Sequence, residues 1–515
     1  MNICLINPPQ IVPQAWGPPA IFQPLGLAYI AAVLERNYEV HILDAHTEGW
    51  KNLRIINDKY YSGLTIDEIG DRIKNIRPQI VGISVPFSTS EKIALEVAEK
   101  IKRVDRNIII ILGGPHPSAL PLETLSCSHV DFVVIGEGEY STLELVEKLD
   151  KYDHKELQKV KGIGYKRNGR SIITPPRDLI EDLSSLPLPA RHLLPMEKYF
   201  TLARENRESR YTYTYSNRWA SVVTSRGCPF QCVFCSIHLT MGKRFRARSP
   251  ENVIHELSHL VHSYNIKHIN FEDDAMTLNK HRFERICELI VEKNLRITWS
   301  APNGIRGDTL DETAIKKMKW SGCKRVFVAP ESGVQRVVNN VIKKKLDLKK
   351  VEKSIVTLKR YGIKVDGSFV IGFIGETKSD ILSTIRYALK LRKFGMSVAG
   401  FHIATPLYGT ELYRTAKQKG YLKKIIESSM LSTRESLIET PQWTAEEIRQ
   451  LREVADLIVN FKFYFIGSFL SIIRNFLRNP QKFVSALVKP QKFIQVLTRL
   501  LNLVRAYFSK RGFLE

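Results

Sequence analysis

The spacing of apolar residues in the first 150 residues predicts alternating strands and helices. Short β-branched runs such as 2–7 and 80–85 suit buried strands, whereas 24–36 and 90–104 place apolar residues at the helical period. This alternation is typical of a doubly wound, Rossmann-like parallel sheet of the α/β class, which binds ligands beyond the carboxyl ends of its strands. No G-x-G-x-x-G motif follows the first strand, so a dinucleotide is not the expected ligand.

Three strand ends in this first unit (1–150) carry glycines, hydroxyls or acids, within the motifs VGISVPFSTS, GGPHPS and GEGE. Paired glycines let a bulky ring or a nucleotide tail approach the backbone, and serine hydroxyls on a facing loop can hydrogen-bond it. We therefore expect a ligand site at this edge of the sheet. Its expected residues are Ser84, Ser88, Gly113, Gly114, Glu137 and Gly138.

Residues 151–219 predict a linker that contains a hairpin at 162–174. From 220 to 420 the strand-helix period returns six times, which predicts an incomplete TIM-like (β/α)6 barrel with its chemistry at the carboxyl ends of the strands. The expected strands are 220–224, 268–272, 297–301, 325–330, 364–372 and 398–406.

Three cysteines, Cys228, Cys232 and Cys235, follow the first of these barrel strands in the spacing C-x3-C-x2-C. Thiolates gathered so closely select zinc, Cu(I) or iron–sulfur clusters. A zinc site would need a fourth ligand, and His238 is the nearest candidate. The residues themselves leave a cluster and a Cys3His zinc knuckle as alternatives.

Other barrel strands also end in polar or glycine-containing motifs, which a purely structural barrel would not need. They are Glu272-Asp273-Asp274, Glu331-Ser332-Gly333, and the stretch 372–377 that contains Gly372 and Gly375. For Asp273 and Asp274 the alternative is helix capping ahead of Asn279. Arg306 is a further candidate at the barrel mouth, with a surface salt bridge as its alternative.

The composition of the chain indicates which classes of binding partner are favoured but does not select one of them. The 515 residues carry a formal net charge of +24, which favours anionic partners such as nucleic acid, a membrane surface or phosphorylated substrates. No run reaches the roughly 20 apolar residues of a membrane span, and the first residues form a hydrophobic strand without a charged segment, so a cytoplasmic location is expected. Four scattered cysteines, Cys4, Cys127, Cys287 and Cys323, are expected to be buried thiols.

The C-terminal region (421–515) predicts helices. Residues 443–460 form a helix capped by Thr444, and from Asn460 onward ten lysines and arginines accompany one acidic residue, Glu515. This basic, amphipathic, helical tail could lie on an anionic membrane at its inner face, or it could bury its apolar side against the barrel.

The cysteine spacing, with Phe234 before the last cysteine, resembles the radical S-adenosylmethionine (SAM) superfamily. The resemblance implies that the three cysteines hold three irons of a 4Fe-4S cluster whose fourth iron binds SAM. It further implies that the reduced cluster cleaves SAM to methionine and a 5′-deoxyadenosyl radical, which abstracts hydrogen from an unactivated carbon.

The same resemblance assigns parts of SAM to the barrel strand ends. Glu272 and Asp273 lie where the superfamily binds the amino group, Glu331 and Ser332 contact the ribose or carboxylate, and the loop at Gly372 and Gly375 passes beside the adenine. Ile374 stands where relatives usually have proline, so this loop departs from the superfamily pattern.

The N-terminal strand ends resemble the cobalamin-binding domain found in front of many radical SAM enzymes, which makes cobalamin the expected ligand of that edge. Residues 44–49 also spell D-x-H-x-x-G, the motif by which a histidine ligates cobalt, but here it follows the second strand rather than the first. We interpret this match as accidental, with His46 on a surface loop and no protein histidine on cobalt.

Most relatives of this kind are methyltransferases that use a 5′-deoxyadenosyl radical and methylcobalamin. The resemblance therefore implies methylation of an unactivated carbon in a hydrophobic substrate (lipid, isoprenoid or tetrapyrrole) or a natural product, with a flavodoxin- or ferredoxin-type electron donor. A minority use the same parts otherwise, including the anaerobic magnesium-protoporphyrin monomethyl ester oxidative cyclase and ring-contracting enzymes. An oxidative cyclase reaction or another cobalamin-dependent rearrangement is therefore the alternative. No residue is assigned as a general acid or base.

Two functions of other classes stay open. A tRNA methylthiotransferase shares the cysteine motif, but its N-terminal domain should bring three further cysteines, and this one has only Cys4 and Cys127. A zinc and nucleic-acid-binding protein would leave the polar strand ends unexplained. Nucleic acid is therefore not the expected partner.

Overall fold

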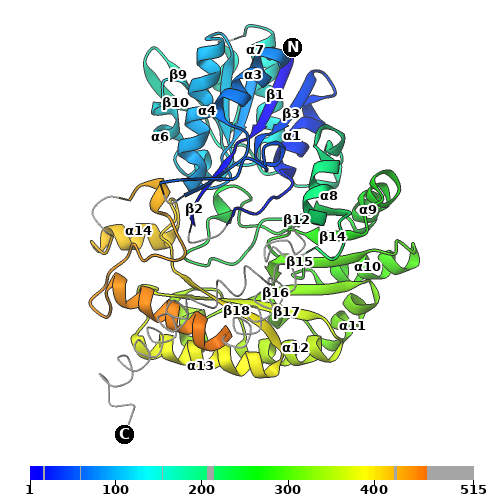
Figure 1. The fold of residues 1–515 in the computed structure, drawn as a ribbon, viewed down its shortest axis with the longest axis vertical. Helices are drawn as coiled ribbons and strands as arrows, with labels where there is room; N and C mark the ends of the chain where they lie inside the picture. Colours follow the sequence, from blue (N-terminus) through cyan, green and yellow to red (C-terminus); the bar gives the residue numbers. More distant parts are fainter. Residues whose placement is uncertain (15–17, 58, 154, 206–213, 423–425, 461–515) are drawn as a thin grey trace, which may run out of the picture.

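The computed structural model describes residues 1–460 apart from 15–17, 58, 154, 206–213 and 423–425, and residues 461–515 lie outside the described part. Two α/β units, each built on its own parallel sheet, stack one above the other (Figure 1). Strand β1 (Asn2–Asn7) starts at the top of this view and ends where the two units meet. The carboxyl end of the first sheet therefore faces the second unit.

The N-terminal sheet has seven strands in the order β10-β9-β8-β7-β6-β1-β3. Because β1 lies between β3 and β6, the winding of the chain reverses there, and this is the point at which doubly wound sheets bind ligands. Strands β1, β3, β6, β7 and β8 of this sheet are parallel, and the hairpin predicted within the linker joins the sheet at its far edge. The strands are β3 (Glu39–Asp44), β6 (Ile80–Ser84), β7 (Ile109–Gly113), β8 (Phe132–Val134), β9 (Ile163–Arg167) and β10 (Arg170–Ile173).

Alternation along β1 sends its side chains to two separate cores. Ile3 and Leu5 pack with helices α1 (Leu25–Leu34) and α7 (Glu139–Asp150), whereas Cys4 and Ile6 pack with α3 (Ile66–Ile76) and α4 (Glu91–Val104). Both faces of a parallel sheet are covered in this way because successive side chains point to opposite sides. The predicted Rossmann-like unit is confirmed.

Short elements with weak periodicity were not predicted. A small antiparallel sheet pairs β2 (Gln10–Pro13) with β5 (Lys59–Ser62), which in turn pairs with β4 (Arg54–Ile56). Helices α2 (Ala45–Glu48), α5 (Pro115–Ala119), α6 (Pro121–Ser126) and α8 (Met196–Glu205) are the other additions. Helices α2, α5 and α6 have 4, 5 and 6 residues and are too short to show several turns of a regular pattern, whereas α8 has 10.

The second sheet has six parallel strands in chain order, β11-β14-β15-β16-β17-β18, as expected for an open (β/α)6 barrel. Its strands are β11 (Trp219–Val222), β14 (His268–Phe271), β15 (Thr298–Ile305), β16 (Cys323–Glu331), β17 (Lys364–Ile371) and β18 (Met396–Ile403). Its helices are α9 (Pro250–Tyr264), α10 (Lys280–Glu292), α11 (Glu312–Trp320), α12 (Leu348–Arg360) and α13 (Lys378–Phe394). Ser249 caps α9 by accepting from the Asn252 amide, as predicted.

Side-chain amides cover both edges of this open sheet. On β11, Gln23 from the N-terminal unit donates to the Trp219 carbonyl at 3.2 Å and accepts from the Ser221 amide at 3.1 Å. On β18, Asn460 makes the matching pair of hydrogen bonds with the backbone of Ala399, at 2.7 and 3.1 Å. Unpaired edge groups are thus satisfied without closing the barrel.

The segment after β18 packs back on the barrel. Helix α14 (Glu411–Gln418) follows, and then the predicted helix appears at residues 445–460 with Thr444 as its cap. The indole of Trp443 donates to the Glu376 carbonyl, and Asp456 accepts from the Phe401 amide. No helix among the described residues is long and apolar enough to cross a membrane. The basic tail, for which membrane contact and packing against the barrel were the alternatives, lies outside those residues.

Candidate active site

The three cysteines lie on a loop that follows β11 and the two-residue strand β12 (Ser225–Arg226). Gly227 begins this loop with φ +78°, and a Cβ on it would stand 2.3 Å from the Arg244 carbonyl oxygen, so only glycine fits there. Within the loop the Cys235 amide donates to the Cys232 carbonyl at 3.1 Å. All three thiols are free and partly exposed.

Burial and a nearby lysine act in opposite directions on the pKa of these thiols. Burial raises the pKa of all three, that of Cys232 to about 12, while the charge of Lys344 acts in the opposite direction on each of them. Within the described ranges no three Cys, His, Asp or Glu side chains are placed to hold a single metal ion. In a 4Fe-4S cluster each thiolate binds a different iron, so the three sulfurs need not converge on one point. The arrangement of the three cysteines on one loop is thus compatible with a cluster.

Asp273 holds the residues that lead into the cysteine loop. Its buried carboxylate accepts hydrogen bonds from the Thr224 amide at 3.1 Å, from the Thr224 hydroxyl at 2.7 Å, and from the Ser225 hydroxyl. Helix α10 is capped by Asn279 itself, which accepts from the Arg282 amide. The alternative role of Asp273 as a helix cap is therefore wrong, and this carboxylate holds the strand that leads into the cysteines.

The neighbouring acids face the site differently. Glu272 accepts from the Ser221 hydroxyl at 3.2 Å, and burial raises its pKa to about 7. Asp274 as a residue is open to solvent, but protein atoms packed around its carboxylate, together with the charge of Asp273, raise its pKa to about 6. Its charge also raises the pKa of Cys228 and Cys235. Asp274 is thus the open carboxylate beside the thiols, and its place as the third acid of the run was the only signal for it in the sequence.

Residues from the later strands form the far side of the mouth. Glu331 ends β16 with φ +65° and pairs with Lys344 at 2.7 Å. Ser332 is fully buried and shares a hydrogen bond with Thr384 at 2.9 Å. The Phe234 and Phe373 rings lie 5.6 Å apart, which brings the last cysteine next to the glycine loop after β17. The predicted polar strand ends therefore gather around the cysteines.

That glycine loop is held by a buried acid. Gly372 and Gly375 have φ values of +86° and +92°, and the Glu376 carboxylate accepts from the Gly372 and Phe373 amides at 2.7 and 3.1 Å. Glu376 is completely buried, and burial raises its pKa to about 8. Sequence reasoning did not select this residue as part of the site.

At the N-terminal sheet the expected cobalamin residues also come together. Ser84 and Gly113 are register partners on neighbouring strands. Gly114 has φ +115°, and a Cβ on it would stand 2.9 Å from the Val85 carbonyl oxygen. Ser88 contacts the His116 ring at 3.1 Å. A glycine-lined edge beside the β1/β6 switch point is what a bulky planar ligand requires.

Glu137 and Gly138 make contacts of a different kind. The Glu137 carboxylate is buried and accepts from Arg226 at 2.9 Å and from Arg246 at 2.8 and 3.0 Å, while Glu139 accepts from the other end of Arg226 at 2.6 Å. A Cβ on Gly138 would stand 3.0 Å from Ile30. The GEGE motif therefore links the N-terminal unit, through buried ion pairs, to strand β12, which immediately precedes the cysteine loop.

Comparison with known proteins follows the same division into two units. A model of the B12 binding domain matches residues 18–146, and a model of the radical SAM superfamily matches residues 222–388. An uncharacterized methyltransferase of Pyrococcus horikoshii is 36% identical over 457 residues, covering 88% of this chain and 90% of its own. The cytidylyl-2-hydroxyethylphosphonate methyltransferase of Streptomyces wedmorensis is 31% identical, covering 84% of this chain and 85% of its own.

The chain belongs to the cobalamin-dependent radical SAM enzymes. A solved structure with this fold is that of the cobalamin-dependent S-adenosylmethionine radical enzyme OxsB with aqua-cobalamin and SAM bound. It has a TM-score of 0.66 at 16% sequence identity and covers 99% of this chain and 75% of its own. The cofactors of the present chain are, like those of its family, a 4Fe-4S cluster, SAM and cobalamin. As a radical SAM enzyme, the chain also needs a reductant and a small-molecule substrate.

The placement of His46 in the enzyme corrects one expectation. His46 is buried rather than on a surface loop, and burial lowers its pKa to about 4. It lies on α2, directly after β3, the edge strand of the N-terminal sheet, with β1 between it and β6. The D-x-H-x-x-G motif therefore sits beside the sheet edge and not at the switch point. Its aspartate, Asp44, accepts from the buried Tyr199 hydroxyl at 2.5 Å.

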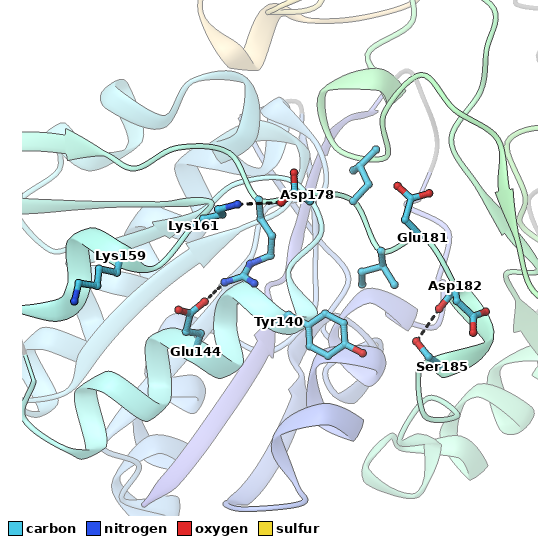
Figure 2. A pocket seen from close by; sticks show the side chains of 11 residues that line it. Tyr140, Glu144, Lys159, Lys161, Asp178, Glu181, Asp182 and Ser185 are labelled. Carbon is cyan, nitrogen blue, oxygen red and sulfur yellow. Dashed lines mark hydrogen bonds and ion pairs between the residues drawn. The ribbon is translucent and has the colours of Figure 1, made fainter.

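A hollow of about 500 Å³ lies away from the cysteine loop of the enzyme, between α7 and the linker after the hairpin (Figure 2). Some of its charged side chains pair across it, Lys161 with Asp178 and Arg177 with Glu144. None of the residues expected to bind a cofactor lines it. We therefore do not assign it to the chemistry.

Proposed function

We propose that this enzyme transfers a methyl group from SAM, by way of cobalamin, to an unactivated carbon of a small molecule. The observation that carries the proposal is the direct tie between the two cofactor regions. Arg226, two residues before Cys228, is held by Glu137 and Glu139 of the cobalamin domain. A rigid link suits a reaction in which a radical made at one cofactor and a group carried by the other must reach the same carbon.

The chain's own residues divide the work by position. We assign Cys228, Cys232 and Cys235 to the cluster, which when reduced supplies the electron that cleaves SAM. The residues that we propose orient SAM are Phe234, Glu272, Asp273, Asp274, Glu331, Ser332, Gly372 and Gly375. Among these acids Asp274 is the exposed one and Asp273 is fully engaged. We therefore expect Asp274 to meet the amino group of SAM and Asp273 to act through the cysteine loop.

At the other sheet, we propose that Ser84, Ser88, Gly113 and Gly114 line the cobalamin site. Glu137 and Gly138 act there by docking the domain, since the Glu137 carboxylate is already occupied by two guanidinium groups. His46 of the D-x-H-x-x-G motif follows the edge strand β3 and lies away from the switch point, and we propose that cobalamin is bound without this imidazole on cobalt.

For the acceptor we propose a hydrophobic or natural-product substrate. The methyltransferase names of the two relatives that span most of the chain support methyl transfer, and the second of them names a cytidylyl phosphonate. The excess of basic residues would suit such an anionic group. Lipid, isoprenoid, tetrapyrrole and nucleotidyl phosphonate compounds therefore form the panel to be tested. A flavodoxin- or ferredoxin-type protein is the proposed electron donor.

The test is anaerobic reconstitution with iron, sulfide and cobalamin, followed by reductant, SAM and the substrate panel. Mass spectrometry should find 5′-deoxyadenosine and S-adenosylhomocysteine together, with a mass gain of one methylene in the acceptor. Deoxyadenosine without S-adenosylhomocysteine would instead support an oxidative cyclase reaction. Absence of both products under a competent reductant would refute the proposal.

A further inference from the structure

Three consecutive lysines, residues 343–345, differ in how far the fold buries their side chains and in the partners they contact. They follow a π-helical turn (Val337–Val341), and Lys343 and Lys345 both have left-handed backbone with φ +62° and +50°. Such backbone is disfavoured for lysine and persists only where surrounding contacts impose it. Lys343 points to the surface, where it pairs with Glu411, whereas the Lys344 side chain is only 13% exposed.

Contacts on two sides press this segment against the cysteine loop. The Val233 amide, one residue after Cys232, donates to the Ile342 carbonyl at 3.0 Å. Arg306 donates to the Lys344 carbonyl at 3.0 Å, and its guanidinium lies 3.7 Å from the ring centre of Phe230, two residues after Cys228. Lys344 is therefore held in the layer between the cysteine loop and the end of β16.

The Lys344 ammonium has two partners inside this layer. It donates to the Ala329 carbonyl at 2.6 Å and to the Glu331 carboxylate at 2.7 Å. An ammonium so nearly buried requires such partners, because its desolvation is costly. Its charge reaches all three thiols, whereas that of Glu331 is felt at Cys232. Both charges of the ion pair therefore act on the cysteine loop, and that of Lys344 acts on all three thiols.

We propose that Lys344 makes reduction of the cluster more favourable, because its ammonium stabilises the negative charge that the reduced cluster carries. The Glu331 carboxylate opposes this effect and so adjusts the reduction potential of the cluster. One-electron reduction by an external donor adds a negative charge to a group already held by three thiolates. A nearby cation makes that step more favourable, and a nearby carboxylate makes it less so. The proposal rests on the cluster and not on methyl transfer, so it can fail while the proposed function stands.

The experiment is a redox titration of the anaerobically reconstituted full chain without SAM, followed by the electron paramagnetic resonance signal of the reduced cluster. Lys344→Met should shift the midpoint potential to more negative values, and Glu331→Gln should shift it to more positive values. Lys344→Arg keeps the charge and should stay close to the wild type. Lys343→Met, which removes the adjacent exposed lysine, is the matched control and should leave the potential unchanged.

Opposite signs for the two variants are the result that a merely structural role cannot produce, since loss of packing would disturb both in the same way. Iron content per chain, measured on each variant, checks that the cluster has assembled. If Lys344→Met does not retain a cluster, the positive shift of Glu331→Gln and the unchanged potential of Lys344→Arg decide the question. Potentials for Lys344→Met and Lys343→Met that coincide, or shifts of one sign for Lys344→Met and Glu331→Gln, would overturn the proposal.

Discussion

Replacing Glu137 by glutamine tests whether the buried ion pairs hold the two units of the enzyme together. The Glu137 side chain is 4% exposed, and its partners Arg226 and Arg246 are 8% and 3% exposed. Glutamine has nearly the same shape but no charge. After the change Arg226 keeps Glu139, whereas Arg246 loses the only carboxylate that it contacts among the described residues.

The expected loss of unfolding free energy follows from the Arg246 charge, which stays buried after Glu137 is replaced. Removing one partner of a buried ion pair costs about 3–5 kcal/mol, because the other charge stays buried without compensation. Arg246 also donates to the carbonyls of Ile180 at 2.6 Å and Met241 at 2.7 Å, which moderates the loss. We therefore expect about 3 kcal/mol, which is roughly a hundredfold change in the equilibrium, at 1.4 kcal/mol for each factor of ten.

The assay is urea unfolding of the apoprotein, followed by tryptophan fluorescence and by far-ultraviolet circular dichroism. Two units can unfold in separate steps, so each transition is fitted separately. Glu137→Gln should lower the free energy of the earlier transition by the expected amount. Glu144→Gln is the control, because its pair with Arg177 is partly exposed and should contribute about 0–1 kcal/mol. If the two variants lost the same free energy of unfolding, the idea that the ion pairs of the GEGE motif hold the two units together would be refuted.

Three further changes test other parts of the site. Cys232→Ala should abolish cluster assembly and SAM cleavage but leave cobalamin bound, as measured by iron content and absorbance; cleavage that persists would contradict the cluster assignment. Asp273→Ala removes the acceptor for three donors and should reduce the iron retained per chain, whereas Glu288→Ala on the surface should not. Glu376 has a pKa of about 8 in the folded chain against 4.5 for the free residue, so the folded state binds the extra proton between these values and stability should fall as pH rises from about 4.5 to 8. Glu376→Gln should flatten that fall in urea unfolding, and unchanged slopes would show that another group causes it.

The local pattern of the chain already determined which elements form and in what order they occur. Period-two and period-3.6 spacing of apolar residues depends only on neighbours, so the helix predicted at 90–104 is found as α4 at Glu91–Val104. The cysteine spacing is equally local, because all three ligands lie on one loop of eight residues. The carboxyl ends of parallel strands meet at one edge, which is why the polar strand ends could be expected to gather.

Tertiary structure decided what each side chain at that edge does. Glu137 meets Arg226 and Arg246 across 89 and 109 residues of chain, and no local pattern encodes such partners. Asp273 and Asp274 are neighbours in sequence, yet one is buried under three hydrogen bonds and the other opens beside the thiols.

The same holds for the lysine run at 343–345, in which the local sequence does not distinguish one lysine from another. Only the left-handed turns at Lys343 and Lys345, imposed by contacts with the cysteine loop and Arg306, send Lys344 inward. A side chain's role in this enzyme is thus decided by the charge and burial that distant segments bring to it, and those depend on the packing of two units and not on the order of residues alone.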